Sequence, residues 1–327
     1  MTTDQLTEVK AARRLLAQHL PTTRLVQGHY LSEQLGTPTY LKLETELPTG
    51  SFKVRGALYA LSRYMNERKG AKTSHEIEVV ASSTGNHGAA VAWAAKRLGV
   101  PATIFLPENP NPAKLRRITS LGPTVVEVGA DLDDARRAAE NYANESGAYF
   151  LNDATSRMVP VGAGTISLEL LEHPPDFKTV IVPVGDTALI RGVGSVLKQH
   201  VPEINVIGVQ SLGAPAYHRS WTAGRPISTD TCHTVAGGLA TRTAVPENVR
   251  EIRKVVDQMH LVSDHQILQA LRFLILNEHV VAEPAGAAST AAALSLKDGL
   301  EGPVALLVTG ANLAEAHLRK AVEAGSG

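Results

Sequence analysis

A lysine that follows a turn-forming segment is the first candidate for a catalytic residue. Pro48, Thr49 and Gly50 favour a turn, and Ser51 is expected to cap a helix that begins directly after it. Lys53 would then lie in the first helical turn, where the helix dipole disfavours an ammonium and lowers the pKa of the amine. A lysine with a lowered pKa can form a Schiff base or transfer a proton, although a lone lysine is more commonly a solvated surface residue.

A second polar segment, 82–88 (SSTGNHG), lies between an expected strand and an alanine-rich helix. Its glycines permit a tight turn. The hydroxyls of Ser83 and Thr84, together with the first free N–H groups of the helix, could bind a carboxylate. The same pattern also suits an ordinary capping loop, and His87 is expected to pack or cap rather than to catalyse.

Two further loops follow expected strands near the middle and the end of the chain. Segment 184–190 (VGDTALI) has the position of a phosphate-binding loop at a helix N-terminus, although Asp186 would repel a phosphate unless it points away. In 308–312 (VTGAN), the hydroxyl of Thr309 could bond a ligand nitrogen. The glycines of 192–194 lack the third glycine of a dinucleotide fingerprint and fall inside an expected helix, so we discount them.

Strands that position these loops are expected wherever short apolar runs alternate with helical patterns. One helix is expected over 85–98, ending at Gly99. The alternation predicts an α/β fold with largely parallel sheets covered by helices on both faces, and ligands at the carboxyl ends of the strands. The expected strands are 39–44, 77–82, 102–106, 124–128, 148–151, 179–184, 205–210, 279–283 and 303–309.

The composition excludes several classes of partner. The 32 Lys and Arg residues balance 32 Asp and Glu residues, which argues against nucleic acid, so the basic stretch 114–117 is expected to be a solvated helix face. No apolar run or leader pattern indicates a membrane span or export, so a cytoplasmic location is expected. A single cysteine, Cys232, excludes an internal disulfide framework and a cysteine-rich zinc site.

Five segments in order resemble fold-type II pyridoxal-phosphate (PLP) enzymes, in the serine/threonine dehydratase branch that includes threonine ammonia-lyase. They read LSEQLGTPTYLKLETELPTGSFKVRGA, SSTGNHGAAVAWAAKRLG, VPVGDTALIRGVG, AEPAGAA and LLVTGANL. The resemblance covers nearly the whole chain. It implies the two-lobed fold of the tryptophan synthase β subunit, with a large PLP-binding domain over 1–71 and 149–327. A small mobile domain over 72–148 would close over the substrate, and the assembly would be a homodimer.

The resemblance also implies roles for individual residues. Lys53 would form the Schiff base with PLP and later remove the α-proton, and Thr84 is the other candidate catalytic residue. Asn86 would contact the phenolic oxygen of the ring, and Thr309 its nitrogen. The candidate cofactor-binding residues are Phe52, Lys53, Asn86, Gly185, Asp186, Thr187, Ala188, Leu189, Glu283 and Thr309. The candidate substrate-binding residues are Ser83, Thr84, Gly85 and His87.

The implied reaction is α,β-elimination on a β-hydroxy amino acid, by default L-threonine or L-serine, giving a 2-oxo acid and ammonia. Other β-substituted substrates remain open: phenylserine, hydroxyaspartate, diaminopropionate or an intermediate of ectoine degradation. A racemase, a β-replacement synthase and a non-catalytic PLP-binding sensor are less favoured. Candidate side-chain pocket residues lie in 211–221 and 236–243. Because the chain ends soon after Asn312, no C-terminal regulatory domain is expected.

Three positions depart from the family pattern. The phosphate loop, usually a run of glycines, reads Gly-Asp-Thr-Ala over 185–188, and Asp186 is expected to cap the helix or to pair with Arg191. Thr84 stands where racemising relatives tend to carry a serine, which makes racemisation less favoured. Segment 209–214 contains no carboxylate, so no divalent metal site is expected there.

Overall fold

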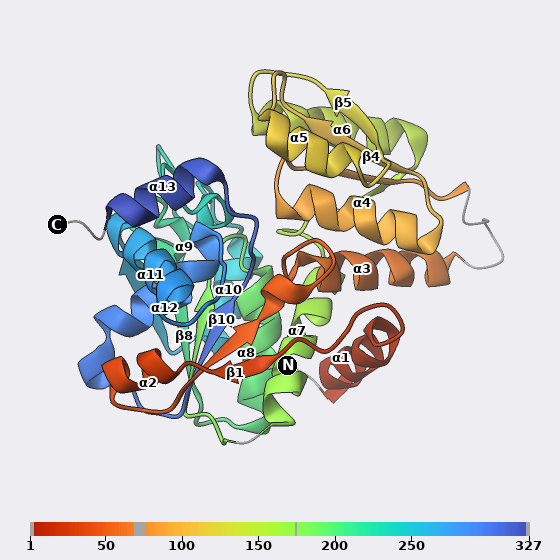
Figure 1. Ribbon diagram of the computed structural model, residues 1–327. Coiled ribbons are helices and arrows are strands. Elements are labelled where there is room, and N and C mark those ends of the chain that lie inside the picture. The colour runs from red at the N-terminus through yellow and green to blue at the C-terminus, as the bar shows by residue number, and fades with distance from the viewer. Residues whose placement is uncertain (1–2, 69–75, 174, 325–327) are drawn as a thin grey trace.

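Two sheets organise the chain in the computed structural model, which describes residues 3–68, 76–173 and 175–324. Within these residues, the larger sheet has six strands in the order β1-β2-β10-β7-β8-β9, and the smaller has four in the order β5-β4-β3-β6. Each sheet forms the centre of its own lobe (Figure 1). Only the pairing of β1 with β2 is antiparallel. The expected two-lobed α/β fold is therefore confirmed.

The strands are short and mostly buried. Their bounds are β1 (Leu25–Gln27), β2 (Thr39–Leu43), β3 (Val79–Ser82), β4 (Ala102–Leu106), β5 (Thr124–Glu127), β6 (Tyr149–Phe150), β7 (Thr179–Pro183), β8 (Asn205–Ser211), β9 (Gln258–Val262) and β10 (Val304–Val308).

Helices connect the strands and cover both faces of each sheet, as right-handed crossovers between parallel strands require. Their bounds are α1 (Thr3–Leu16), α2 (His29–Leu35), α3 (Lys53–Glu67), α4 (Asn86–Leu98), α5 (Pro112–Thr119), α6 (Leu132–Ser146), α7 (Met158–Leu171), α8 (Ala188–His200), α9 (Ala216–Ala223), α10 (Pro246–Val255), α11 (Asp264–Leu276), α12 (Pro284–Ser295) and α13 (Glu315–Glu323). The short 3₁₀ turns are η1 (Glu44–Glu46), η3 (Gly237–Leu239) and η4 (Lys297–Gly299).

Most expected elements are found close to their expected bounds. The helix expected over 85–98 is α4, and Gly99 ends it in the left-handed conformation with φ 68°. The strand expected over 279–283 is wrong, because this segment is an irregular loop that begins with His279 in the left-handed conformation at φ 57°. Strands β1 and β9 were not expected. Both lie at sheet edges and are only partly buried, so their sequences lack the continuous apolar run of a central strand.

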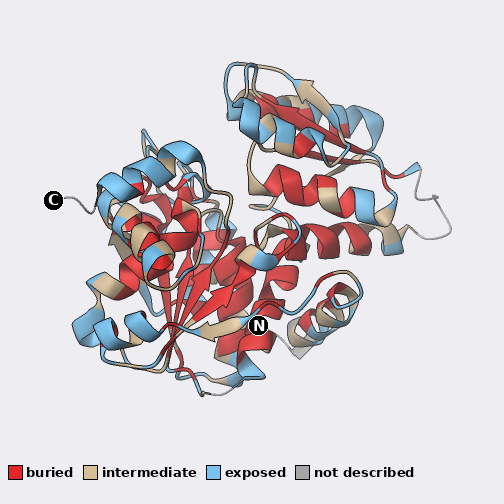
Figure 2. Ribbon diagram, viewed as in Figure 1, coloured by how far each residue is buried: buried red, intermediate tan, exposed pale blue. Residues whose placement is uncertain are grey.

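Buried residues fill the space between sheets and helices in both lobes (Figure 2). Helix α7 and the alanine-rich helix α12 are buried on nearly all sides, which is possible because their small and apolar side chains need no contact with water. Helix α3 packs on both α7 and α4, so it links the two lobes. None of the described helices is both long and apolar enough to cross a bilayer.

The smaller sheet corresponds to the small domain expected over 72–148. Strand β6 (Tyr149–Phe150) completes this sheet and extends it two residues beyond the expected boundary. The other expected boundary, between residues 71 and 72, lies outside the described residues.

A buried ionic network lies beneath the start of α3. Arg55 donates from Nε to Oε2 of Glu44 at 2.7 Å and from Nη1 to Oε1 of Glu169 at 2.7 Å. Lys42 donates to the other oxygen of Glu169 at 2.5 Å, and Thr23 donates to Glu44 at 2.7 Å. All five residues are buried, so each charge depends on its partners rather than on water. The network joins β2, η1, α3 and α7 directly beside Lys53.

Candidate active site

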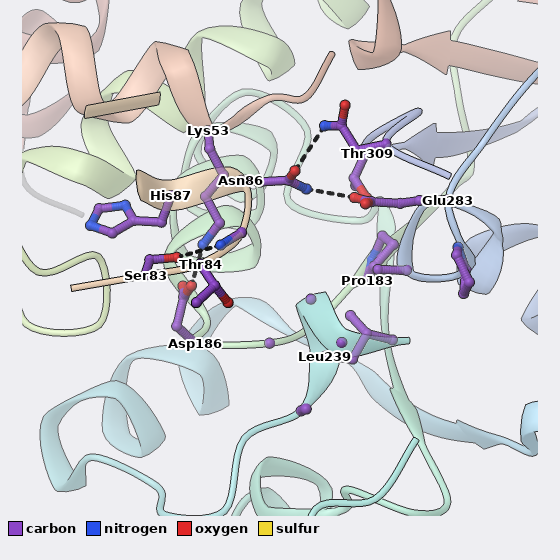
Figure 3. Close-up of a pocket in the computed structure, with 18 of the residues that line it drawn as sticks. Lys53, Ser83, Thr84, Asn86, His87, Pro183, Asp186, Leu239, Glu283 and Thr309 are labelled. Carbon is purple, nitrogen blue, oxygen red and sulfur yellow. Dashed lines mark hydrogen bonds and ion pairs between the residues drawn. The ribbon is translucent and has the colours of Figure 1, made fainter. Parts of the chain in front are cut away.

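A cavity of about 510 Å³ lies where the loops at the strand ends converge. The loops after β3, β7 and β10 all line it, as the strand-end rule predicts for open α/β sheets. The segments that contribute side chains come from both lobes, and Figure 3 shows Lys53 and Asn86 near its centre.

Lys53 is the first residue of α3, so its expected place in the first helical turn is confirmed. The expected cap is wrong: Phe52 is the residue before the helix, and no side chain caps it. Ser51 instead pairs through its backbone with Gly310 at the end of β10. Its buried hydroxyl has no hydrogen-bond partner among the described residues. The bridge fixes the start of α3 to the end of the central strand.

Two carboxylates hold the amine of Lys53. Its Nζ donates to Oδ2 of Asp153 at 2.5 Å and also contacts Oδ2 of Asp186. Burial disfavours the charged amine, but the two carboxylates outweigh burial and raise the pKa of Lys53. The expected lowering of this pKa by the helix dipole is therefore wrong. Burial opposes the charge of Asp153 too, yet neighbouring His87 and Lys53 hold its pKa below the usual range.

Asp153 was missed in the sequence, although a signal was present. It follows the expected strand 148–151 by two residues, so the strand-end rule applied to it as well. His87 lies behind Asp153: its Nε2 donates to the carbonyl of Leu151 at 2.8 Å, and its Nδ1 is 3.5 Å from Oδ2 of Asp153. His87 thus supports Asp153, and its expected contact with substrate stays a prediction.

The loop before α4 has the expected form of an anion site. The hydroxyl of Ser83 accepts from the N–H of Gly85 at 3.1 Å, and the side chain of Thr84 also lines the cavity. Gly88 is required for this turn, because a Cβ at its position would collide with the backbone oxygen of Ser83. The free N–H groups at the start of α4 then face the cavity beside two hydroxyls, an arrangement suited to a carboxylate.

Asn86 is oriented by neighbours on three elements. Its Nδ2 donates to Oε1 of Glu283 at 2.6 Å, and its Oδ1 accepts from Asn312 at 2.8 Å and from Arg117 at 3.2 Å. Burial raises the pKa of Glu283, although Asn86 and Arg117 act in the opposite direction. Thr309, at the end of β10, is buried and lines the same cavity. The candidates Asn86, Glu283 and Thr309 are thus brought together.

The candidate phosphate loop turns from β7 into α8. Oδ1 of Asp186 accepts from the N–H of Ala188, the first residue of α8, at 2.8 Å, but the N-cap position belongs to Thr187 and no side chain caps the helix, so the expected capping role is wrong. The expected pair with Arg191 is wrong, because Arg191 binds Glu251 at 2.8 Å and donates to the hydroxyl of Thr187 at 3.1 Å. Thr187 has φ 79°, a conformation that strains a β-branched residue.

A close backbone approach shapes the other side of this loop. A Cβ at Gly185 would collide with the backbone oxygen of Gly238 in η3, so only glycine fits there. Leu189 and the segment 234–241 line the cavity as well. The candidate pocket segment 236–243 therefore contributes side chains to the cavity. None of the described residues of 211–221 lines it.

The basic stretch at 114–117 is only partly the solvated face that was expected. Lys114 and Arg116 are exposed, as expected, but Lys114 and the partly buried Arg117 also line the cavity. Arg117 is half-buried and reaches the carbonyl of Thr49 as well as Asn86. The expectation was wrong for Arg117 because a helix of the small lobe turns this face toward the large lobe, which composition alone does not reveal.

The residues of the cavity fit PLP, the cofactor that the resemblance implies. A carboxylate oxygen of Asp186 already occupies an anion position at the N-terminus of α8, where a phosphate would bind. The amine of Lys53 points toward the same place. The amide of Asn86 and the hydroxyl of Thr309 offer polar contacts to a ring. Among the described residues, no three His, Cys, Asp or Glu side chains are grouped to hold a metal.

Replacing Asp186 with glycine is expected to tighten PLP binding to the apoprotein by about tenfold. Two effects act in this direction: the carboxylate no longer competes for the N–H of Ala188, and it no longer repels the phosphate. A titration that follows PLP absorbance gives the Kd. Asp230→Gly, at an exposed loop position, is the matched control and should leave the Kd unchanged. Weaker binding in Asp186→Gly would mean that the carboxylate is needed to build the loop.

Comparison with known proteins places the chain in a family. Residues 16–310 match the model described as "Pyridoxal-phosphate dependent enzyme". An L-threonine ammonia-lyase of Thermotoga maritima is 36% identical over 308 residues, which cover 94% of this chain and 75% of the relative. The processed form of threonine deaminase isoform 2 from Solanum lycopersicum is 26% identical with a TM-score of 0.91, over 99% of this chain and 89% of that one. Maize serine racemase is 28% identical with a TM-score of 0.88, over 97% and 96%.

Proposed function

The chain belongs to the pyridoxal-phosphate dependent enzymes, and on this premise we propose that it catalyses α,β-elimination of a β-hydroxy amino acid to a 2-oxo acid and ammonia. Threonine and serine are the default substrates, in keeping with the threonine ammonia-lyase and threonine deaminase relatives. One observation carries the proposal: the amine of Lys53 lies between two helix N-termini, those of α4 and α8. One terminus suits the phosphate of the cofactor, and the other suits the carboxylate of an amino acid.

PLP, when bound, supplies a ring that withdraws electrons from the α-carbon of an amino acid. Lys53 is the residue that would hold it covalently, and the loop 185–189 would hold its phosphate. Asn86 would contact the phenolic oxygen, and Thr309 the ring nitrogen. Since threonine is neutral, Thr309 provides no charge that would keep the ring nitrogen protonated.

The remaining residues bind the substrate and move protons. Ser83, Thr84 and the N–H groups of α4 bind the α-carboxylate and so fix the orientation of the α-hydrogen. Lys53 Nζ takes this hydrogen as the general base. Asp153 and Asp186 favour the charged amine, so they stabilise Lys53 once it has accepted the proton.

Elimination is favoured over racemisation by the residue on the other side of the substrate. A racemase needs a second acid or base opposite the lysine, and Thr84 is the side chain available from the loop before α4. Its methyl group occupies space that a serine would leave open. Maize serine racemase has a similar fold, so the fold alone does not distinguish elimination from racemisation. An activity assay makes that distinction.

The test is a substrate panel. The PLP-loaded protein is incubated with threonine, serine, phenylserine, β-hydroxyaspartate and 2,3-diaminopropionate, and ammonia release is measured for each. At least one member is expected to release ammonia without any second substrate. A requirement for an added nucleophile would identify a β-replacement synthase, and ammonia from no member would contradict elimination on these classes.

Three further properties are part of the proposal. The lobe around the smaller sheet closes over the substrate, which fits a cavity lined by both lobes. The protein works as a homodimer, and it is cytoplasmic.

Borohydride reduction should bleach the visible absorbance and attach the cofactor to Lys53, which distinguishes an enzyme of this family from a nicotinamide-dependent dehydrogenase.

A further inference from the structure

We infer that the cavity contains a second anion subsite formed by Lys114, Arg117 and His317, so that the preferred substrate carries an acidic group on its side chain. The inference rests on the proposed function and narrows its substrate class to β-hydroxy amino acids with a distal carboxylate, for which β-hydroxyaspartate is the simplest probe. Lys114 and Arg117 come from α5 of the small lobe, and His317 comes from α13 of the large lobe.

Arg117 is a half-buried cation without an anionic partner. Its Nη1 donates to Oδ1 of Asn86 at 3.2 Å, and its Nη2 donates to the carbonyl of Thr49. Both acceptors are neutral, and no carboxylate of the described residues lies within ion-pair distance of Arg117. Burial lowers the pKa of Arg117, partly offset by Glu283. A guanidinium stays charged even so, and a desolvated charge without a partner is costly.

The other two residues line the same cavity: Lys114 adds a second positive charge, and His317 adds an imidazole that can donate a hydrogen bond. Lys114 precedes Arg117 by three residues, so both lie on one face of α5. Burial lowers the pKa of His317, and the positive charges of Lys320 and Lys114 lower it further, while Asp264 raises it. The three residues form a basic wall to which both lobes contribute, so closure of the lobes would bring these side chains into contact with a bound ligand.

The acids of the cavity are placed elsewhere. Asp153 and Asp186 both hold Lys53, at the other end of the cavity. Among the described residues that line the cavity, Glu283 is the remaining acid; its side chain bonds Asn86, and burial raises its pKa. Asp153 and Asp186 are therefore already balanced by Lys53, whereas the charges of Lys114 and Arg117 exceed that of Glu283.

The α-carboxylate of an amino acid does not account for the basic wall. The N-terminus of α4 and the hydroxyls of Ser83 and Thr84 already form a site for that group. Arg117 is instead bonded to Oδ1 of Asn86 and to the carbonyl of Thr49. A second carboxylate on the substrate side chain would supply the anion that Arg117 lacks, with two parallel hydrogen bonds to the guanidinium.

The test compares Arg117→Met with Arg116→Met in the PLP-loaded protein. Both variants remove one arginine from α5, but Arg116 is exposed and does not line the cavity. Binding of succinate and of butyrate, which differ in the second carboxylate, is measured by calorimetry. The wild type and Arg116→Met are expected to bind succinate more tightly than butyrate. In Arg117→Met, the affinity for succinate should fall about 30-fold and the affinity for butyrate only a few-fold.

Kinetics give the second measurement. The kcat/KM for β-hydroxyaspartate should exceed that for threonine in the wild type and fall about 100-fold in Arg117→Met, mainly through KM. The kcat/KM for threonine should fall by a smaller factor in this variant, because threonine loses only the effect of the hydrogen bond from Arg117 to Asn86. Equal succinate affinity in Arg116→Met and Arg117→Met would overturn the subsite. If succinate behaves as expected but no substrate releases ammonia, the subsite stands and the proposed elimination fails.

Discussion

Lys53→Ala is expected to lower ammonia release by about 10⁴-fold or more. The substitution removes both the amine that would hold PLP covalently and the base that takes the α-proton, and no other lysine lies beside Asp153 and Asp186 among the described residues. Initial rates at saturating PLP and substrate measure the loss. Mass spectrometry after borohydride reduction should find the cofactor attached to the wild type and not to the variant.

A matched substitution controls for the loss of a lysine. Lys96 is exposed near the end of α4, away from the cavity, so Lys96→Ala should keep both turnover and the reducible adduct. The assignment of Lys53 would be contradicted if Lys53→Ala retained turnover near the wild-type rate, or if its cofactor were still trapped by borohydride.

Glu169→Ala is expected to cost about 3–5 kcal/mol of unfolding free energy. Glu169 balances the buried charges of Arg55 and Lys42, and its removal leaves Lys42 without its ion-pair partner and Arg55 with Glu44 alone. Denaturant unfolding of the apoprotein measures the change. The matched control is Glu172→Ala: this carboxylate also binds an arginine, but its side chain is 58% exposed, so the loss should be below about 1 kcal/mol.

The contribution of Glu169 should also depend on pH. Burial disfavours its charge, but Arg55 and Lys42 outweigh burial and lower the pKa of Glu169. A carboxyl group whose pKa is lower in the folded state stabilises the fold above its unfolded value of 4.5, and this contribution is lost as the pH falls through the folded value. The stability difference between the wild type and Glu169→Gln should therefore shrink in acid. A difference that stayed constant below pH 4.5 would contradict this account.

Much of the fold followed from the residues themselves. Continuous apolar runs marked β4, β7 and β10, because strands covered on both faces have no polar side. The partly exposed edge strands β1 and β9 lack that signature. The apolar run at 279–283 was misread as a strand: it pairs with no strand among the described residues, and Val281 within it is exposed.

The site was predicted well wherever a residue's role is local. Asp186 bonds the N–H of Ala188 within its own turn, and Lys53 begins α3 directly after a short loop. Contacts between distant segments could not be predicted. The pair of Asp153 with Lys53 spans 100 residues, and Arg117 of the small lobe reaches the carbonyl of Thr49 only because the two lobes pack together. The predicted lowering of the pKa of Lys53 was therefore wrong, because this pKa depends on carboxylates that are distant in the sequence.

The central claim is that this chain releases ammonia from a β-hydroxy amino acid by α,β-elimination, and the stoichiometry of the products tests it most directly. Ammonia and 2-oxo acid are measured together during turnover of the best substrate in the panel, with PLP present and no second substrate added. The account predicts equal amounts of both products, in step with the loss of the amino acid. Inversion of the α-carbon with neither product formed would contradict it.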